Sequence, residues 1–322
     1  MTARWGMTLP LEGVPLREVP ELARQVEDLG YSGIWSAEGT GPEGFTPLAA
    51  AAAVTSQIRL GIAVAPVFTR GPVLLAQTAA TMASLAPGRF TLGIGSGSDI
   101  IVDRLNDIAF ERPYSRTRDT LRFLRAALAG ERVERAYETF RVGGYRCETA
   151  PEEQVPILVA GLRSRMLELA GTEGDGAILT LISAADAARV VPVVRGEDGA
   201  RSDKEVAARI LVAPTTDAER ARAAGRRLLT AYLNVPVYRE FYRWLGHEEL
   251  EPVWRLWAAG ERRQALGAVP DSVVDSLVIH GAPEQLREHL QRFVAAGVET
   301  PTAMMLDVGV DPRQALRDAA PR

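Results

Sequence analysis

Residues 59–95 read RLGIAVAPVFTRGPVLLAQTAATMASLAPGRFTLGIG. The stretch begins with a short apolar run, Arg59–Val64, and ends with another, Phe90–Gly95. Between them, Pro72–Leu85 has proline at a first-turn position and stops before Pro87-Gly88, which is typical of a helix. Short apolar runs of this kind indicate strands that are buried on both faces. The stretch therefore predicts a right-handed βαβ unit with parallel strands.

The same alternation of short apolar runs and longer amphipathic segments extends along the chain. Segments Val19–Leu29, Thr117–Leu128 and Pro283–Ala296 have helical spacing of their apolar residues or helix-end signals. Eight strand-helix units favour a closed α/β barrel, the (β/α)8 TIM barrel, over an open doubly wound sheet, and the choice depends on that count. The predicted strands are Trp5–Leu9, Gly33–Ser36, Arg59–Val64, Phe90–Gly95, Ile157–Ala160, Ala177–Leu181, Arg209–Val212 and Ala303–Leu306.

Two long connections interrupt this pattern. The chain shows no internal repeat and no linker, and we interpret residues 1–322 as one domain. Asp99–Arg116 follows the fourth predicted strand, and 213–274 follows the seventh. Long loops after barrel strands lie on the C-terminal rim, where active sites are built. We therefore expect rim insertions, and in 213–274 a helical lid. Its tryptophans either line the site or form a satellite core.

Composition excludes several classes of function. Cys147 is the only cysteine, and with three histidines it cannot build a usual zinc cage, so no metal is expected. A net charge of −4 without a Lys/Arg block gives no reason to bind nucleic acid. No uncharged apolar run approaches the roughly 18 residues of a membrane span, and no secretory signal is evident. We expect a cytoplasmic protein acting on a small molecule.

Three strand ends carry residues suited to a flat, phosphate-bearing ligand. Small residues at Ala63 and Ala65 allow a flat ring to approach the backbone of the third strand closely. Glycines in the turn Gly95–Ser98 expose backbone N–H groups that can cradle an anion. Ala160–Arg165 joins a strand to a helix start, where N–H groups, a serine and two arginines can hold phosphate. Taken singly, the first two segments are more typical of an ordinary strand-to-helix loop and a tight turn, and the third is equally compatible with two solvated arginines at a helix start.

Glu38 follows the second predicted strand, on the expected catalytic rim. A carboxylate there can accept a hydrogen bond from a cofactor ring or transfer a proton. The alternative is that Glu38 only caps a helix or lies in a loop, without a role in the site. Asp99 follows the glycine-rich turn of the fourth strand and is the second catalytic candidate; Tyr114 is a weaker one, and His280 is more consistent with a structural role.

Together these segments resemble the luciferase-like monooxygenase superfamily, and most closely its coenzyme F420-dependent oxidoreductase branch. The resemblance rests on the order and spacing of motifs over nearly the whole chain. These motifs include Gly30-Tyr-Ser-Gly-Ile-Trp-Ser-Ala-Glu38, Phe45-Thr-Pro-Leu-Ala-Ala50, Ile58-Arg-Leu-Gly61, Pro87-Gly-Arg-Phe90, Leu92-Gly-Ile-Gly95, Val155-Pro-Ile157, Gly174-Asp-Gly176, Gly281-Ala-Pro-Glu284 and Ala295-Ala-Gly-Val298.

The resemblance implies a TIM barrel with its cofactor at the C-terminal rim, often beside a non-proline cis peptide in the third strand, which by position is Ala63–Val64. It also implies a homodimer, and its subgroup pattern points to actinobacteria. The residues implied for cofactor binding are Ala63, Val64, Gly95, Ser96, Gly97, Ser98, Ala160, Gly161, Leu162, Arg163, Ser164 and Arg165.

The sequence departs from the sugar-phosphate dehydrogenases of this branch, which place a histidine after the rim acid. Here Glu38 is followed by Gly39, so the usual general base is missing and sugar-phosphate oxidation is not expected. The function implied is hydride transfer between C5 of the deazaflavin and an organic substrate, with reduction of a C=C or C=N bond in secondary metabolism or detoxification.

Two other functions remain open from the sequence. One is an FMN-dependent luciferase-like monooxygenase, since FMN and F420 share ring and phosphate positions; Arg163 and Arg165 favour F420, whose oligoglutamate tail is anionic. The other is a non-catalytic flavin-binding protein, which would have no need of a substrate lid in 213–274.

Overall fold

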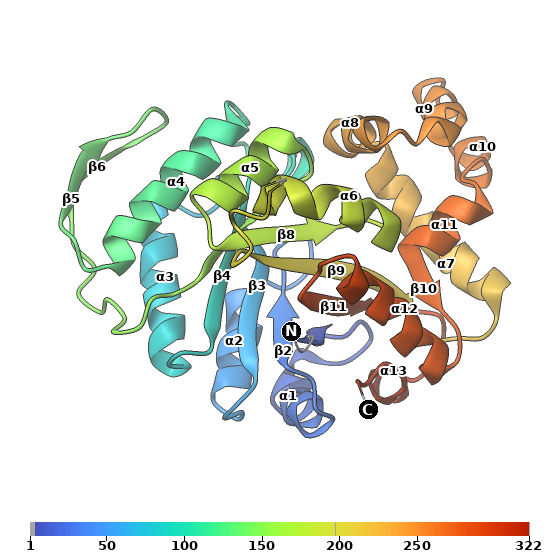
Figure 1. The fold of residues 1–322 in the computed structure, drawn as a ribbon, viewed down its shortest axis with the longest axis horizontal. Coiled ribbons are helices and arrows are strands. Elements are labelled where there is room, and N and C mark those ends of the chain that lie inside the picture. The colour runs from blue at the N-terminus through green and yellow to red at the C-terminus, as the bar shows by residue number, and fades with distance from the viewer. Residues whose placement is uncertain (1–3, 197, 322) are drawn as a thin grey trace.

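A computed structural model describes residues 4–196 and 198–321 of the chain. Its strands are β1 (Gly6–Thr8), β2 (Gly33–Ser36), β3 (Arg59–Pro66), β4 (Phe90–Gly95), β5 (Val133–Ala136), β6 (Arg141–Tyr145), β7 (Ile157–Ala160), β8 (Gly176–Thr180), β9 (Glu205–Ala213), β10 (Val278–His280) and β11 (Thr300–Met305). The main sheet has the order β10-β9-β11-β1-β2-β3-β4-β7-β8, and β8 pairs back onto β9. Every strand of this sheet except β10 thus joins a closed parallel ring, which confirms the predicted (β/α)8 barrel (Figure 1).

Helices surround this ring (Figure 1). α3 has the predicted bounds, and the buried residues of α1, which include Val19, Leu22 and Val26, have the helical spacing predicted for this segment. The helices are α1 (Val19–Asp28), α2 (Phe45–Ala52), α3 (Pro72–Leu85), α4 (Pro113–Leu128), α5 (Ser164–Thr172), α6 (Ala184–Arg195), α7 (Ala218–Leu233), α8 (Pro236–Leu245), α9 (Glu251–Ala258), α10 (Arg262–Gly267), α11 (Asp271–Leu277), α12 (Pro283–Ala295) and α13 (Pro312–Asp318). Short turns of 3₁₀- or π-helix are η1 (Leu16–Glu18), η2 (Ile100–Arg104) and η3 (Glu248–Leu250).

The indole of Trp35 fills the middle of the barrel. It forms a buried cluster with Ala63, Leu158, Ile178 and Ala207, which come from four other barrel strands. Glycines make room for the ring: a Cβ at Gly6 would lie 2.8 Å from Trp35 Cδ1, a Cβ at Gly33 would lie 2.9 Å from Nε1, and a Cβ at Gly61 would overlap the ring. The barrel is therefore closed at mid-height, and space for a ligand exists only at its ends.

An ion pair closes the end of the barrel where the strands begin. Glu205, the first residue of β9, accepts hydrogen bonds from Arg59 Nη1 and Nη2, at 2.9 and 3.0 Å, across the ring. Arg59 is the first residue of β3, and Thr300 at the start of β11 adds a 2.6 Å hydrogen bond to Glu205. The opposite, C-terminal end of the strands is thus the end that can receive a ligand.

The structure departs from the predicted elements in several places, and β9 and β11 begin at Glu205 and Thr300 rather than at Arg209 and Ala303. A β5–β6 hairpin follows α4, a short β10 extends the sheet beyond β9, and α4 begins at Pro113 rather than Thr117. Residues 213–274 hold α7, α8, η3, α9, α10 and the start of α11. In Figure 1, α8, α9 and α10 lie toward the end of the barrel to which the β2 arrow points.

Two features are absent from the described residues. No described helix is both long enough and apolar enough to cross a membrane. Within residues 4–196 and 198–321, no group of three or more His, Cys, Asp or Glu side chains is placed to hold a metal ion.

Candidate functional site

The C-terminal mouth of the barrel is floored by inward-facing side chains that are only partly buried. The layer below, around Trp35, is buried, whereas the next inward positions retain exposure because nothing from the barrel covers them. These positions come from six different strands, so the floor of the mouth is built by most of the barrel rather than by a single loop. They are Thr8, Val64, Ala160, Thr180, Arg209 and Met304.

Val64, Gly95 and Ala160 meet on this floor. A Cβ added to Gly95 would lie 2.9 Å from Val64 Cγ2 and 3.1 Å from the Ala160 Cβ, so these three residues of β3, β4 and β7 are neighbours. The Ala63–Val64 peptide is cis, as the resemblance implied, and it falls where the β3–β4 register shifts between Ile62 and Ala65. Small side chains therefore leave a shallow surface that a flat ring could cover.

The turn after β4 places the next predicted residues beside this floor. Gly97 has φ +71°, a left-handed conformation that favours glycine and lets the chain turn sharply after β4. Ser98 Oγ accepts a 3.3 Å hydrogen bond from the Ile101 amide and so caps η2, while Ser96 Oγ donates to the Gly97 carbonyl at 3.2 Å. Asp99 is half-buried, and no hydrogen bond or ion pair of the described chain engages its carboxylate.

The turn after β7 lies next to the turn after β4, because Val159 pairs with Ile94. Gly161 packs close to the start of α5, where a Cβ would lie 3.1 Å from the Leu167 amide nitrogen. The first N–H groups of any helix lack intrahelical partners, so α5 presents donors here. Arg163 is exposed and forms no ion pair within the described chain, and the Arg165 guanidinium stacks 4.4 Å from the Tyr114 ring centroid.

Glu38 lies at the rim after β2, but its carboxylate is already engaged. Arg70 Nε donates to both carboxylate oxygens, at 2.9 and 3.0 Å, and Arg70 Nη2 donates to Oε1 at 2.5 Å. The Gly44 amide adds a 3.3 Å hydrogen bond. The Arg70 guanidinium also stacks 4.5 Å from the Phe45 ring centroid and bonds to Glu43. Glu38 is therefore part of a fixed acid–guanidinium cluster rather than a free carboxylate.

Sequence reasoning missed Arg70 and Arg209. Arg70 directly precedes the helix-start signal Gly71-Pro72, and that position made it look like an ordinary loop residue. Arg209 is the one charged residue within an otherwise apolar run, Val206–Ala213, of a strand whose neighbours are buried. A charge at an inward-facing barrel position was the signal that could have identified it.

Two contacts attach the 213–274 segment to the barrel end of β8. His247 Nε2 lies 3.0 Å from Asp186 Oδ2, and Asp186 Oδ2 accepts a 2.6 Å hydrogen bond from Ser183 Oγ. Tyr242 Oη donates to the Leu181 carbonyl at 2.6 Å and is buried. The junction between α8 and η3 is thus fixed to the loop from β8 into α6.

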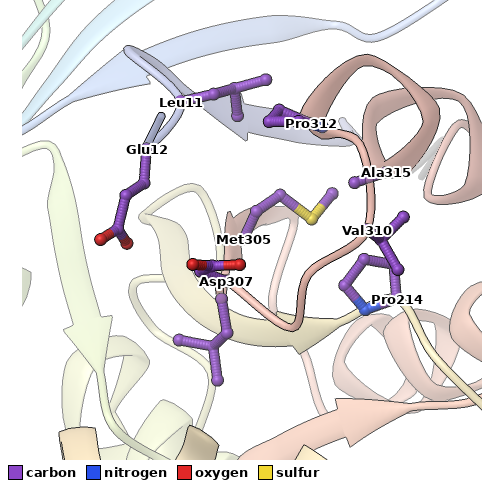
Figure 2. Close-up of a pocket in the computed structure, with 9 residues that line it drawn as sticks. Leu11, Glu12, Pro214, Met305, Asp307, Val310, Pro312 and Ala315 are labelled. Carbon is purple, nitrogen blue, oxygen red and sulfur yellow. The ribbon is translucent and has the colours of Figure 1, made fainter. Parts of the chain in front are cut away.

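Figure 2 shows a small pocket at the outer edge of the same rim. It lies between the loop after β1, the ends of β9 and β11, and α13, and it contains none of the predicted site residues. Its lining is Leu11, Glu12, Pro214, Met305, Leu306, Asp307, Val310, Pro312 and Ala315. The predicted cofactor residues instead gather on the open floor across β3, β4 and β7.

Comparison with known proteins agrees with this architecture. A model of the family described as luciferase-like monooxygenase matches residues 2–300. The chain belongs to this family. A 5,10-methylenetetrahydromethanopterin reductase of Methanolobus tindarius is 26% identical, with 91% of this chain and 92% of that protein aligned. An F420-dependent glucose-6-phosphate dehydrogenase of Rhodococcus erythropolis is 27% identical, with 95% of this chain and 93% of that protein aligned.

Solved structures of the same fold include the coenzyme F420-dependent tetrahydromethanopterin reductase from Methanopyrus kandleri. It superposes with a TM-score of 0.81 at 21% identity, over 99% of this chain and 98% of that one. At this identity the likeness supports the luciferase-like fold of the chain and nothing finer.

Proposed function

We propose that this luciferase-like protein is a coenzyme F420-dependent oxidoreductase that reduces a C=C or C=N bond of an organic substrate. The observation that carries the proposal is the meeting of Val64, Gly95 and Ala160 on one shallow floor, beside two turns that expose backbone donors. The two relatives described above, a methanopterin reductase and a glucose-6-phosphate dehydrogenase, also carry names that indicate hydride chemistry on small molecules.

The residues present fit a deazaflavin. Any side chain at Gly95 would fill the space over Val64 and Ala160, so glycine keeps the floor open for a ring. The start of α5, with Ser164 and the unpaired Arg163, would hold the phosphate and the anionic tail. When bound, F420 supplies a hydride at C5. The protein then has to orient the substrate over the ring, exclude water and deliver a proton.

Asp99 fits the role of proton carrier better than Glu38. Glu38 accepts three hydrogen bonds from Arg70, which occupy its carboxylate oxygens and leave them poorly placed to exchange a proton with a substrate. Asp99 is half-buried beside the glycine-rich turn, with a carboxylate that the described residues leave unengaged. In this proposal Glu38 fixes the shape of the rim and Asp99 exchanges the proton with substrate or water.

The 213–274 segment is proposed as the lid over the mouth. Its α8–η3 junction is fixed to the β8 end through His247 and Tyr242, and this attachment beside the mouth supports the proposal. A lid excludes water from the reacting atoms, which strengthens electrostatic interactions and prevents loss of a hydride to side reactions. A protein that only stored flavin would gain nothing from such a cover.

Titration of the purified protein with F420 and with FMN, followed by cofactor fluorescence, tests the proposal. We expect micromolar or tighter F420 binding, at least about tenfold tighter than FMN, because Arg163 and Arg165 can meet the oligoglutamate tail. Preference for FMN would place the monooxygenase function first. Binding of F420 without turnover of any C=C or C=N substrate would favour the non-catalytic flavin-binding protein.

A paired glycine substitution locates the binding surface. Gly95→Ala puts a methyl group against Val64 and Ala160, and overpacking of about 1–3 kcal/mol corresponds to a loss of roughly tenfold or more in F420 affinity. Gly143→Ala is the matched control, since a Cβ there meets no atom within 4 Å. Equal F420 affinities of the two variants would show that the deazaflavin ring does not bind on the β3–β4–β7 floor.

A further inference from the structure

Arg209 reaches across the barrel mouth from β9. Its Nη1 donates to the Ala63 carbonyl at 3.3 Å and its Nη2 lies 2.8 Å from the Met304 sulfur. Ala63 belongs to β3, which is not a neighbour of β9 in the ring, so the side chain must pass through the barrel interior. Arg209 as a whole keeps partial exposure although its Nε is buried, and the side chain lies among the residues of the floor.

The charge of Arg209 has no carboxylate partner among residues 4–196 and 198–321. A carbonyl oxygen and a thioether sulfur are weak partners for a guanidinium, and its buried Nε makes no hydrogen bond at all. Two other partly buried arginines of this barrel, Arg59 and Arg70, each pair with a glutamate. Because removing a guanidinium from water without an anion is unfavourable, the exception at Arg209 indicates that an anion arrives from outside the chain.

The surroundings of Arg209 select the kind of anion. Burial lowers the pKa of Arg209, and the ionisable groups of the described chain that oppose this are Tyr232 of α7 and Tyr238 of α8. The rings of these two tyrosines stack edge to face with their centroids 5.4 Å apart. Thr8 and Thr180 are uncharged residues of the same floor, and the Thr8 hydroxyl is buried without a hydrogen-bond partner. One cation with neutral neighbours balances the single negative charge of a carboxylate, whereas it would leave one charge of a phosphate ester dianion unbalanced.

We propose that Arg209 binds the carboxylate of an organic-acid substrate in the barrel mouth, beneath the tyrosines of α7 and α8. This inference rests on the proposed function, because it names the substrate class for the same mouth. The guanidinium hydrogens that do not bond to Ala63 or Met304 bind the carboxylate, which fixes one end of the substrate over the β3–β4–β7 floor. Substrates of matching shape that lack the acid lose this anchor.

Calorimetric titration with two matched acid and amide pairs, crotonate with crotonamide and cinnamate with cinnamamide, tests the inference without turnover. We expect the wild-type protein to bind each acid at least about tenfold more tightly than its amide, and inorganic phosphate more weakly than the acids. Arg209→Met should abolish the preference and Arg209→Lys should keep part of it. Arg292→Met, which removes an exposed arginine of α12, should leave the preference unchanged.

Equal binding of acid and amide by the wild-type protein overturns the inference, as does an unchanged preference in Arg209→Met or tighter binding of phosphate. The wild-type comparison stands even where a variant fails to fold. F420 titration separates this inference from the proposed function. Acid preference without F420 binding contradicts the proposed function alone, whereas loss of F420 binding in Arg209→Met, without acid preference in the wild type, makes Arg209 a cofactor ligand.

Discussion

Glu38 and Arg70 lie beside the mouth with their side chains only 10% and 18% exposed. Burial lowers the pKa of Arg70 while its hydrogen bonds and charge interactions with Glu38 and Glu43 raise it, and the upward direction prevails. One guanidinium thus holds the Glu38 carboxylate through three hydrogen bonds, and the geometry of the rim between β2 and β3 depends on this pair. A role for Glu38 as a general base would require this pair to open first.

Replacing Glu38 by Gln leaves the Arg70 charge over Phe45 without its bidentate acceptor. We expect a loss of about 2 kcal/mol in the free energy of unfolding, since hydrogen bonds to charged groups contribute about 1.5–3 kcal/mol. Urea denaturation at pH 7 measures it. Glu43→Gln is the matched control, because Glu43 bonds to the same guanidinium but is 45% exposed, and its effect should be clearly smaller. Equal effects would show that the pair is not the main support of the rim.

At the same scale, the candidate residues could be predicted from the sequence only where chain order determines position. Glu38, Asp99, Gly95–Ser98 and Ala160–Arg165 follow strands directly, so a correct barrel fixes their end of the molecule. Partners are different. The hydrogen bond from Arg70 to Glu38 joins residues 32 positions apart, and the hydrogen bond from Arg209 to Ala63 joins residues 146 positions apart. Such long-range pairs depend on the path of the connecting loops, which local sequence patterns do not predict.

His247 connects the 213–274 segment to the first turn of α6. Its hydrogen bond to Asp186 raises the pKa of His247 to about 9, with a further upward contribution from Glu249 and an opposing one from burial. Ser183 and Arg189 also face Asp186, and Tyr242 packs edge to face against the His247 ring at 5.5 Å. At neutral pH the imidazole is therefore a cation held between two carboxylates.

A pH series should reveal this contact. The folded pKa of His247 lies above the unfolded value of about 6.5, so its stabilisation is complete below that value and is lost as the pH rises through about 9. We expect the wild type to exceed His247→Gln by on the order of 2 kcal/mol in unfolding free energy at pH 6, and the difference to vanish near pH 10. His289→Gln, whose pKa is lowered by burial, serves as the histidine control. A difference that does not change with pH would contradict a charged contact.

Among the elements, the buried apolar strands could be predicted from the sequence, whereas the exposed polar strands could not. All eight predicted strands correspond to barrel strands, because burial on both faces leaves an apolar signature in each. The β5–β6 hairpin carries Glu134, Arg135 and Arg141 and is largely exposed, so its sequence shows no alternation to detect. β10 is formed by three residues that follow α11 without a break, and only pairing with the end of β9 makes them a strand.

At the scale of the whole molecule, β9 joins both ends of the barrel to β3. Glu205 bonds to Arg59 where the strands begin, and Arg209 bonds to Ala63 toward the mouth. These residues are four positions apart on β9, so they share its inward face, with Ala207 against Trp35 between them. The barrel is thus divided into a structural end, where charges are mutually satisfied, and a mouth, where the guanidinium is not.

This division predicts that the two ends can be perturbed separately. Burial raises the pKa of Glu205, but the hydrogen bonds from Arg59 and Thr300 and the charges of Arg59 and Arg4 lower it by more. A lowered folded pKa gives stabilisation that is complete above the ordinary glutamate value and is lost as the pH falls through the folded value. Glu205→Gln should therefore cost about 3 kcal/mol of unfolding free energy at pH 7, since it leaves Arg59 unpaired in the barrel, and progressively less in acid.

Urea denaturation from pH 7 down to pH 3 measures that difference, and F420 titration of the same variant measures the mouth. We expect cofactor affinity to stay within about threefold of the wild type, which is less than 1 kcal/mol, because Trp35 and its cluster lie between Glu205 and the floor. Glu288→Gln, which removes an exposed acid of α12, should change neither quantity measurably. A Glu205→Gln protein that keeps its stability but loses cofactor would contradict the division, because it would make the ion pair a support of the mouth rather than of the barrel's closed end.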